Sequence, residues 1–436
     1  MDRPPASILI IGSGEFGLTT ALSLALRPTF SSTTITLLDR LPFPAADGSS
    51  IDSSRIVRPD YSDAAYARLC HEAQTIWRGA DATHPLHGIG ADGRYTETGL
   101  VLTAEEGGMA YVDASYATVA KLLPELGVKC ELELLETRED VGRVCRTGGG
   151  ALGVRGYANW TSGWADAEGA VRFLRAAVEK TGRVTFGTGE VVGLVEEGGK
   201  VVGVRLKGGV EFRAELTVLA TGAWTPGLVD LSGRSVATGQ VLGYLPLSTE
   251  EWESVKEMPV VFNLSTGIFV IPQHTDHVLK IARHASGYLN PTTITDATTG
   301  TTRIVSTPRT VVTDPGLEAP AEAKAAFSAT LSSLVPQFSG KQLSSTRLCW
   351  YNDTATGDFI VAYHPTKAGL FLATGGSGHA FKFLPVIGGH IVDILERKAD
   401  ARFASKWGWP SGAVEVVTRD GSRGDGGVQM VLELAD

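Results

Sequence analysis

The sequence predicts an α/β fold in which a parallel-sheet domain is interleaved with an α+β domain that carries a mixed β-sheet. The chain has 436 residues, more than one compact core usually holds, so two domains are expected. An apolar run at residues 7–11 leads straight into a glycine-rich turn and a helix. Two further apolar strands that end on glycine turns begin near residues 216 and 370. Segments with strand and turn signals separate them, which indicates two interleaved domains.

The composition is that of an ordinary globular protein and argues against several kinds of partner. Hydrophobic residues make up 43% of the chain, charged residues 20%, and the net charge is −9. A negative chain without a basic face is not expected to bind nucleic acid. No apolar run reaches the roughly 18 residues of a membrane span. Neither a removable signal before the first strand nor a C-terminal peroxisomal address is recognisable, so we expect a cytoplasmic protein with no membrane partner.

The four cysteines, Cys70, Cys130, Cys145 and Cys349, are widely spaced. They form no Cys-x-x-Cys pair and show no metal-ligand spacing. The pattern predicts a reducing compartment, no disulfide framework and no bound metal.

The N-terminal unit has the pattern of a dinucleotide-binding motif. The strand at residues 7–11 is followed by Gly-Ser-Gly-Glu-Phe-Gly at 12–17, a helix at 18–26 and a strand at 34–38 that ends on Asp39. The glycines allow the backbone to approach a pyrophosphate, and the N-terminus of the helix favours its negative charge. Asp39 can accept hydrogen bonds from ribose hydroxyl groups. The motif alone leaves FAD and NAD open.

Three later segments are predicted to complete this domain. Residues 216–224 form a buried strand with a glycine turn, residues 370–379 form a strand that enters a helix at 385–396, and another helix runs from about 163 to 179. We assign to this domain residues 1–98, 154–235 and 345–416.

The two intervening stretches, residues 99–153 and 236–344, are expected to be rich in β-strands. The second stretch contains an alternating strand at 266–272 and another strand at 278–281. We assign both stretches to the second domain, which shapes the substrate pocket. Residues 417–436 are rich in Gly and Asp and are expected to form a mobile tail.

Four blocks of sequence carry a specific resemblance. They are Ser-Arg-Ile-Val-Arg-Pro-Asp-Tyr at 54–61, Gly-Tyr-Ala-Asn with Gly-Trp-Ala-Asp-Ala within 156–167, Leu-Cys-Trp-Tyr-Asn-Asp-Thr at 348–354 and Gly-Ser-Gly-His-Ala-Phe-Lys-Phe at 376–383. In this order they resemble the monomeric sarcosine oxidase group of flavoenzymes, which includes fungal fructosyl amino acid oxidases, L-pipecolate oxidases and saccharopine oxidases. The resemblance implies FAD rather than NAD, a two-domain hydroxylase-like fold and a monomer, with a peroxisomal location as the family's alternative to the cytoplasm.

The motif and the matching blocks imply a set of cofactor-binding residues. These are Gly12, Gly14, Phe16, Gly17, Asp39, Arg40, Ser54, Arg55, Gly222, Trp224, Cys349, Gly376, Gly378, His379 and Lys382.

Cys349 lies in the block where this group attaches FAD through a thioether to the 8α-methyl of its ring. A covalent FAD is therefore expected. A thiolate can add to this electrophilic position, and a basic neighbour such as Arg347 would favour the thiolate. The alternative for a lone cysteine is a buried structural residue.

Lys280 stands between Leu279 and Ile281 on a predicted strand, so its side chain is expected on the opposite face. A lone inward lysine is costly unless it is paired or functional. In the resembled group, the lysine of the matching strand lies over the flavin and promotes its reaction with oxygen by charge. Arg55 matches a residue that stabilises anionic reduced flavin. The alternative is that Lys280 faces solvent.

Arg58 and Lys382 match the residues that bind the substrate carboxylate in the sarcosine oxidase branch. A guanidinium offers two-point recognition, and an ammonium adds charge and a donor. The alternatives are a surface ion pair for Arg58 and a solvated helix entry for Lys382. Tyr61 and Trp350 are further candidates for the substrate pocket, although aromatic residues are as common in the core. His379 is expected either at the pyrimidine edge of the flavin or in plain packing.

The resemblance implies an oxidase that converts a secondary amine to an imine and oxygen to hydrogen peroxide. Tyr351 stands where several fructosyl amino acid oxidases have a second cysteine, which favours a substrate of the L-saccharopine or L-pipecolate type. N-methyl and fructosyl amino acids remain alternatives, as does a secondary metabolite whose imine is trapped in ring closure. A flavoprotein without oxidase activity, either a dehydrogenase or a binding protein, is the alternative of a different class, and an NAD-linked enzyme is a weaker one.

Overall fold

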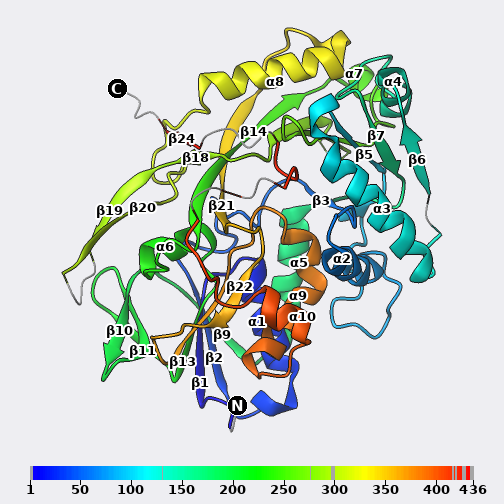
Figure 1. The fold of residues 1–436 in the computed structure, drawn as a ribbon. Coiled ribbons are helices and arrows are strands. Elements are labelled where there is room, and N and C mark those ends of the chain that lie inside the picture. The colour runs from blue at the N-terminus through cyan, green and yellow to red at the C-terminus, as the bar shows by residue number, and fades with distance from the viewer. Residues whose placement is uncertain are drawn as a thin grey trace.

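The computed structural model describes residues 3–129, 131–274, 276–295, 300–414, 417, 420–424 and 429–432. Within these residues the chain forms two main sheets, one of six strands and one of ten. The six-stranded sheet lies in the lower half of Figure 1 and the ten-stranded sheet in the upper half. Cys130 and parts of the predicted tail lie outside the described residues.

The six-stranded sheet is the predicted parallel sheet, with one antiparallel strand at its edge. In order across the sheet, its strands are β22 (Ile360–Tyr363), β23 (Leu370–Thr374), β13 (Leu216–Leu219), β1 (Ser7–Ile11), β2 (Thr34–Asp39) and β9 (Val184–Thr188). The side chains of β1, such as Ile8 and Ile10, are buried because neighbouring strands and helices enclose them. This enclosure explains why the strand reads as a continuous apolar run.

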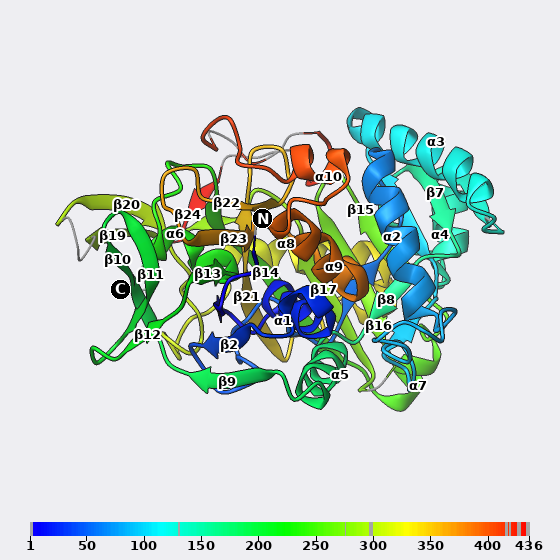
Figure 2. The same cartoon turned by 90° about the horizontal axis from the view of Figure 1, so that it is seen from below.

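Three helices pack around this sheet: α1 (Glu15–Leu26), α5 (Ala167–Lys180) and α9 (Leu384–Leu395). Seen from below, α1 lies near the centre, and it packs against both α5 and α9 (Figure 2). The predicted helix at 385–396 is confirmed within one residue at each end. Helix α1 begins earlier than expected, because Gly14 caps it in an extended conformation and Glu15 already belongs to the first turn.

The ten-stranded sheet is mixed, as predicted for the second domain. In order, its strands are β24 (Met430–Val431), β18 (Tyr288–Leu289), β14 (Val236–Pro246), β17 (Val278–Arg283), β16 (Ile268–Gln273), β15 (Val260–Asn263), β5 (Leu100–Ala104), β7 (Arg155–Asn159) and β6 (Leu132–Leu135), with β21 (Ser345–Asp353) paired to β14. Strands β7 and β21 belong to this sheet although they lie at the ends of segments assigned to the first domain. The exact domain boundaries stay a prediction.

The expectation that residues 99–153 are rich in strands is wrong for most of that stretch. Two helices, α3 (Met109–Glu125) and α4 (Arg138–Cys145), occupy much of it. In α3 the buried side chains include Val112, Val119 and Leu123, and this spacing is that of a helix packed on one side.

The remaining helices are α2 (Ala64–Trp77), α6 (Thr225–Leu228), α7 (Thr249–Glu253), α8 (Ala321–Leu334) and α10 (Ala401–Lys406), with five short 3-10 turns at residues 28–30, 106–108, 222–224, 336–338 and 381–383. Two small sheets consist of β3 (Arg55–Val57), β8 (Gly163–Ala165) and β4 (Tyr95–Thr96), and of β10 (Val191–Glu197), β11 (Lys200–Leu206) and β12 (Glu211–Arg213). Strands β19 (Pro291–Thr295) and β20 (Thr302–Ser306) form a hairpin. In the described part of the chain, no helix has both the length and the apolar character needed to cross a membrane.

Candidate active site

The glycine-rich turn between β1 and α1 is held in a shape that only glycine permits. Gly12 has φ +105°, and a Cβ there would lie 2.4 Å from the carbonyl oxygen of Ala220. A Cβ on Gly17 would lie 1.9 Å from the carbonyl oxygen of Gly12. Both glycines therefore allow the close backbone packing that a dinucleotide turn requires.

Asp39, at the end of β2, is tied to this turn. Its carboxylate accepts hydrogen bonds from the backbone N–H and the hydroxyl of Ser13, each at 2.6 Å. Nearby, Arg40 pairs with Asp47 at 2.6 Å and lies 4.9 Å above the Trp224 ring. Asp39 is thus fixed beside the turn, and its contact with a ribose and the cofactor contacts of Arg40 and Trp224 stay predictions.

A cavity adjoins the turn. Its lining comes from residues 14–16, 49–50, 55, 220, 222–223, 350–352, 374 and 376–381. A Cβ on Gly222 would meet no atom within 4 Å, so the wall there leaves open space for a ligand. The predicted glycines 14, 222, 376 and 378 all line this one cavity. The turn and the cavity beside it would hold a flavin dinucleotide, because glycine walls and a helix N-terminus suit its diphosphate.

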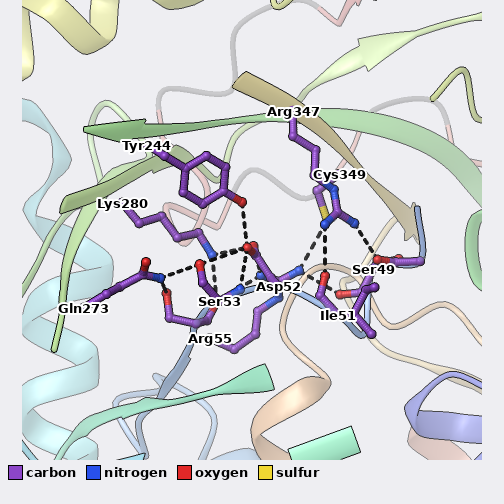
Figure 3. A network of polar contacts seen from close by, with 12 residues as sticks. Ser49, Ile51, Asp52, Ser53, Arg55, Tyr244, Gln273, Lys280, Arg347 and Cys349 are labelled. Atoms are coloured by element: carbon purple, nitrogen blue, oxygen red, sulfur yellow. Dashed lines mark hydrogen bonds and ion pairs between the residues drawn. The ribbon is translucent and has the colours of Figure 1, made fainter. Parts of the chain in front are cut away.

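Lys280 on β17 points inward, and its side chain is 1% exposed. Its Nζ donates to Asp52 Oδ2 at 2.5 Å and to the carbonyl oxygen of Ser54 at 2.7 Å (Figure 3). The solvent-facing alternative is therefore excluded. Burial lowers the pKa of Lys280 to about 8, although the negative charge of Asp52 acts in the opposite direction.

Asp52 joins several groups of the site and was not predicted from the sequence. Besides Lys280, its carboxylate pairs with Arg55 and accepts a hydrogen bond from the Tyr244 hydroxyl at 2.6 Å (Figure 3). Burial alone would raise the pKa of Asp52, but Lys280 and Arg55 hold it well below its usual range. Asp52 is thus an ionised carboxylate shared by the buried Lys280 and the partly buried Arg55.

Cys349 lies beside the same network. It is 2% exposed on β21, and its Sγ accepts a hydrogen bond from Arg55 Nη2 at 3.5 Å. Arg347, on the same strand, donates to the carbonyl oxygens of Gly48 (2.6 Å) and Ile51 (3.2 Å). The basic partner of the thiol is therefore Arg55, and Arg347 holds the adjoining loop.

Arg58 and Lys382 are two buried cations close to one aromatic ring, that of Tyr61. Each is 5% exposed, which excludes the two surface alternatives. The Arg58 guanidinium lies 5.1 Å and the Lys382 Nζ 5.3 Å from the centroid of Tyr61. Burial, and next the charge of Arg58, lowers the pKa of Lys382 to about 7. Two predicted carboxylate-binding residues are thus brought together.

A second cavity contains Arg58 and Tyr61 and shares Ser377 and His379 with the first. The two cavities therefore adjoin at residues 377–379. His379 Nε2 lies 2.8 Å from the carbonyl oxygen of Gly357 and donates to it, so Nδ1 accepts from the Tyr61 hydroxyl at 3.0 Å. Burial lowers the pKa of His379 well below its usual value, so the ring is neutral. Its hydrogen bonds with Tyr61 and Gly357 orient it between the cavities.

Sequence reasoning missed two further residues of the second cavity, His284 and Arg423. His284 lies four positions after Lys280. Residues an even number apart on a strand point to the same face, so this spacing could have placed the two side chains on one face. Burial lowers its pKa well below the usual value. Arg423, 3% exposed, pairs with Asp353 at 2.6 Å. No signal in the Gly- and Asp-rich tail points to a buried arginine.

Trp350 is 1% exposed and packs with its ring in the core of the large sheet. Its Nε1 donates to the carbonyl oxygen of Arg309 at 2.8 Å. These contacts explain its burial without a ligand, and its role in substrate binding stays a prediction.

Ser54, another predicted cofactor residue, contacts the Lys280 network. Its hydroxyl accepts a hydrogen bond from Gln273 Nε2 at 2.8 Å, and its carbonyl oxygen accepts the one from Lys280.

Comparisons with known proteins identify the family of the chain and support its fold. The family model described as FAD dependent oxidoreductase (DAO) matches residues 7–394. Amino acid oxidase imqH of Aspergillus flavus is 31% identical over 458 residues, which cover 90% of this chain and 93% of that protein. L-Saccharopine oxidase of Schizosaccharomyces pombe is 25% identical over 416 residues, covering 92% and 93%. The crystal structure of the fructosamine oxidase Amadoriase II from Aspergillus fumigatus superposes with a TM-score of 0.79 at 28% identity, covering 98% of this chain and 95% of that chain.

Proposed function

Because the chain belongs to the family of FAD-dependent oxidoreductases and is an FAD-dependent amino acid or amine oxidase, we propose that it oxidises a secondary amine in an amino-acid-like substrate. The substrate type we favour is L-saccharopine or L-pipecolate, and the product is the imine. Bound FAD supplies the redox chemistry by taking a hydride equivalent from the carbon beside nitrogen and passing the electrons to oxygen, which leaves as hydrogen peroxide.

The observation that carries this proposal is the cation pair beside the FAD cavity. Arg58 and Tyr61 line the cavity that adjoins the FAD cavity at His379, and the Arg58 guanidinium and the Lys382 Nζ lie 5.1 Å and 5.3 Å from the centroid of the Tyr61 ring. A carboxylate bound by both cations would be fixed at short range from the reacting centre. This is the arrangement that an amino-acid-like substrate requires.

The proposed reaction requires a neutral amine. The lining of the same cavity carries charges of both signs, with Arg58, Lys406 and Arg423 beside Asp63, Asp358 and Asp420, and His284 is neutral there. Only the neutral amine has the electron pair that helps hydride leave the neighbouring carbon. In this proposal the neutral imidazole of His284 accepts a hydrogen bond from the amine.

Lys280 is proposed to serve the oxygen step. Its ammonium is buried and has Asp52 as its counter-ion. In such a low-dielectric site, a fixed positive charge stabilises the negative charge that develops on oxygen. Asp52 favours the charged form of the lysine, and the carboxylate is in turn held by Arg55 and Tyr244.

The pKa of Lys280 predicts a pH dependence. We expect the rate of flavin reoxidation by oxygen to fall as the pH rises through about 8, because Lys280 loses its proton there. Asp52→Asn removes the charge that favours the protonated lysine, so the midpoint should move to lower pH. Stopped-flow reoxidation of reduced enzyme between pH 6 and 10 measures this. Tyr244→Phe removes a hydrogen bond to the same carboxylate but no charge, and should shift the midpoint less. Equal midpoints in wild type and Asp52→Asn would contradict the assignment.

We also propose that FAD is attached covalently through Cys349. The supporting contact is the hydrogen bond that the Arg55 guanidinium donates to the Sγ of Cys349. Acid-precipitated wild-type protein should then stay yellow, whereas Cys349→Ala should release its flavin into the supernatant. Cys70→Ala is the matched control, because Cys70 is also buried and burial raises its pKa to about 12, which keeps that thiol unreactive. A colourless wild-type pellet would refute the thioether.

A peroxide-coupled screen over secondary amino acids tests the proposed substrate class. We expect peroxide with L-saccharopine or L-pipecolate and much slower peroxide release with the corresponding esters, which lack the carboxylate. Peroxide only with N-methyl or fructosyl amino acids would move the substrate to those alternatives. Imine that is trapped in a ring would indicate a secondary metabolite. Flavin reduction without peroxide would indicate a dehydrogenase.

The proposal includes a cytoplasmic monomer, which size-exclusion chromatography and cell fractionation test.

A further inference from the structure

Glu15 is a buried acid at the mouth of the glycine-rich turn, and the proposed reaction does not use it. It is the first residue of α1, is 8% exposed and lines the FAD cavity together with Arg55. Within the described part of the chain, its carboxylate forms no hydrogen bond or ion pair. Its backbone N–H donates to Ser50 Oγ at 2.9 Å, and its carbonyl oxygen accepts from Thr19 Oγ1 at 2.6 Å. A buried carboxylate without a partner is costly and calls for a physical reason.

Groups from several elements face this carboxylate. Arg55 of β3 and Lys382 of the 381–383 turn act on it as positive charges. His379 of the same cavity is neutral because burial lowers its pKa. Burial raises the pKa of Tyr351 on β21, so that group is neutral too. Glu15 thus depends on two cations that do not touch it.

Glu15 and a dinucleotide compete for the same positive potential. The N-terminus of α1 carries the partial positive charge that binds a pyrophosphate. Glu15 lies in the first turn of that helix, so its ionised carboxylate already interacts with the partial positive charge. A diphosphate brings further negative charge and expels water from the cavity, and both effects disfavour a carboxylate.

We propose that Glu15 takes up a proton from solvent when FAD enters its site and is a neutral acid in the holoenzyme. Burial raises the pKa of Glu15 to about 7, and Arg55 and Lys382 act against this rise, so in the empty cavity the group is partly ionised at neutral pH. Bound diphosphate raises the pKa further. With Glu15 neutral, its charge no longer offsets the cations Arg55 and Lys382, which remain available to the flavin and to a substrate carboxylate. The inference rests on FAD binding and not on which amine is oxidised.

The test measures proton uptake during FAD binding. Full-length protein carrying Cys349→Ala, so that binding is reversible, is produced in riboflavin-starved cells and titrated with FAD at pH 8 by calorimetry in two buffers of different protonation enthalpy. We expect close to one proton taken up by Glu15 per FAD. Between pH 7 and the pKa of the bound state, the dissociation constant should rise by up to about tenfold per pH unit. Glu15→Gln in the same background should take up nearly one proton less and bind FAD with a flatter pH dependence.

Two further variants make the result decisive. Lys382→Met removes a titrating cation that acts on Glu15 but should keep the uptake that belongs to Glu15. Glu15→Ser removes the acid with a smaller side chain and should behave like Glu15→Gln, which guards against a packing defect of either variant. If both Glu15 variants take up as many protons as the parent protein and keep its pH slope, the proposal is overturned.

Discussion

Lys280→Met is expected to slow the reaction of reduced flavin with oxygen by about 10²- to 10³-fold, the effect of losing one preorganised charge at an active site. Methionine keeps most of the volume of the lysine stem, so the core around β17 should survive. Reduction of the flavin by substrate should change little, because the substrate carboxylate is assigned to Arg58 and Lys382. Stopped-flow measurements of the two half-reactions separate these effects.

The matched control for this variant is Lys256→Met, which removes a lysine whose side chain is 40% exposed and which pairs with Glu253. It should reoxidise at the wild-type rate. Lys280→Arg keeps a positive charge and should retain more oxygen reactivity than the methionine variant. If Lys280→Met produces peroxide at the wild-type rate, the assignment of Lys280 to the oxygen step is wrong.

Arg58→Ala is expected to lower kcat/KM for a carboxylated amine by about 100-fold or more. Each charge-assisted hydrogen bond to a carboxylate contributes about 1.5–3 kcal/mol, and a guanidinium can form two. The loss should be much smaller for an ester of the same substrate, since the ester has no carboxylate to bind. Steady-state kinetics with both compounds measures the difference.

Arg68→Ala serves as the control, because Arg68 is 43% exposed and pairs with Glu125 on the surface. Arg58→Lys retains charge without the two-point geometry and should fall between wild type and alanine. Equal losses on acid and ester would show that Arg58 supports the fold of the pocket and does not bind the carboxylate.

The nucleotide-binding half of the fold was predictable because its signals are local. Strand β1 is enclosed by its neighbours, so it appears as an apolar run, and the positive φ of Gly12 accounts for the glycine that ends it. Helix α3 was mistaken for β-rich sequence because its buried residues are interspersed with polar ones and Gly107 and Gly108 precede it as a turn signal. Its helical spacing becomes clear only once the packed face is known.

The position of a site residue was predictable where its neighbours in the sequence determine which way its side chain points. The inward direction of Lys280 followed from the apolar residues that flank it on the strand. Its counter-ion Asp52 was missed because the two residues are 228 positions apart and no local pattern joins them. Arg423 was missed for the same reason, since its partner Asp353 is 70 positions away. Long-range ion pairs depend on how the two sheets meet, which no short motif encodes.

The central claim is that the protein oxidises a secondary amine bearing a carboxylate through its FAD. The most direct measurement adds such an amine to the purified protein without oxygen, records the visible spectrum and then admits air. We predict that L-saccharopine or L-pipecolate bleaches the yellow flavin, and that air restores the colour with one hydrogen peroxide released per amine oxidised. A flavin that no secondary amino acid bleaches, or that only primary amines bleach, would contradict the account.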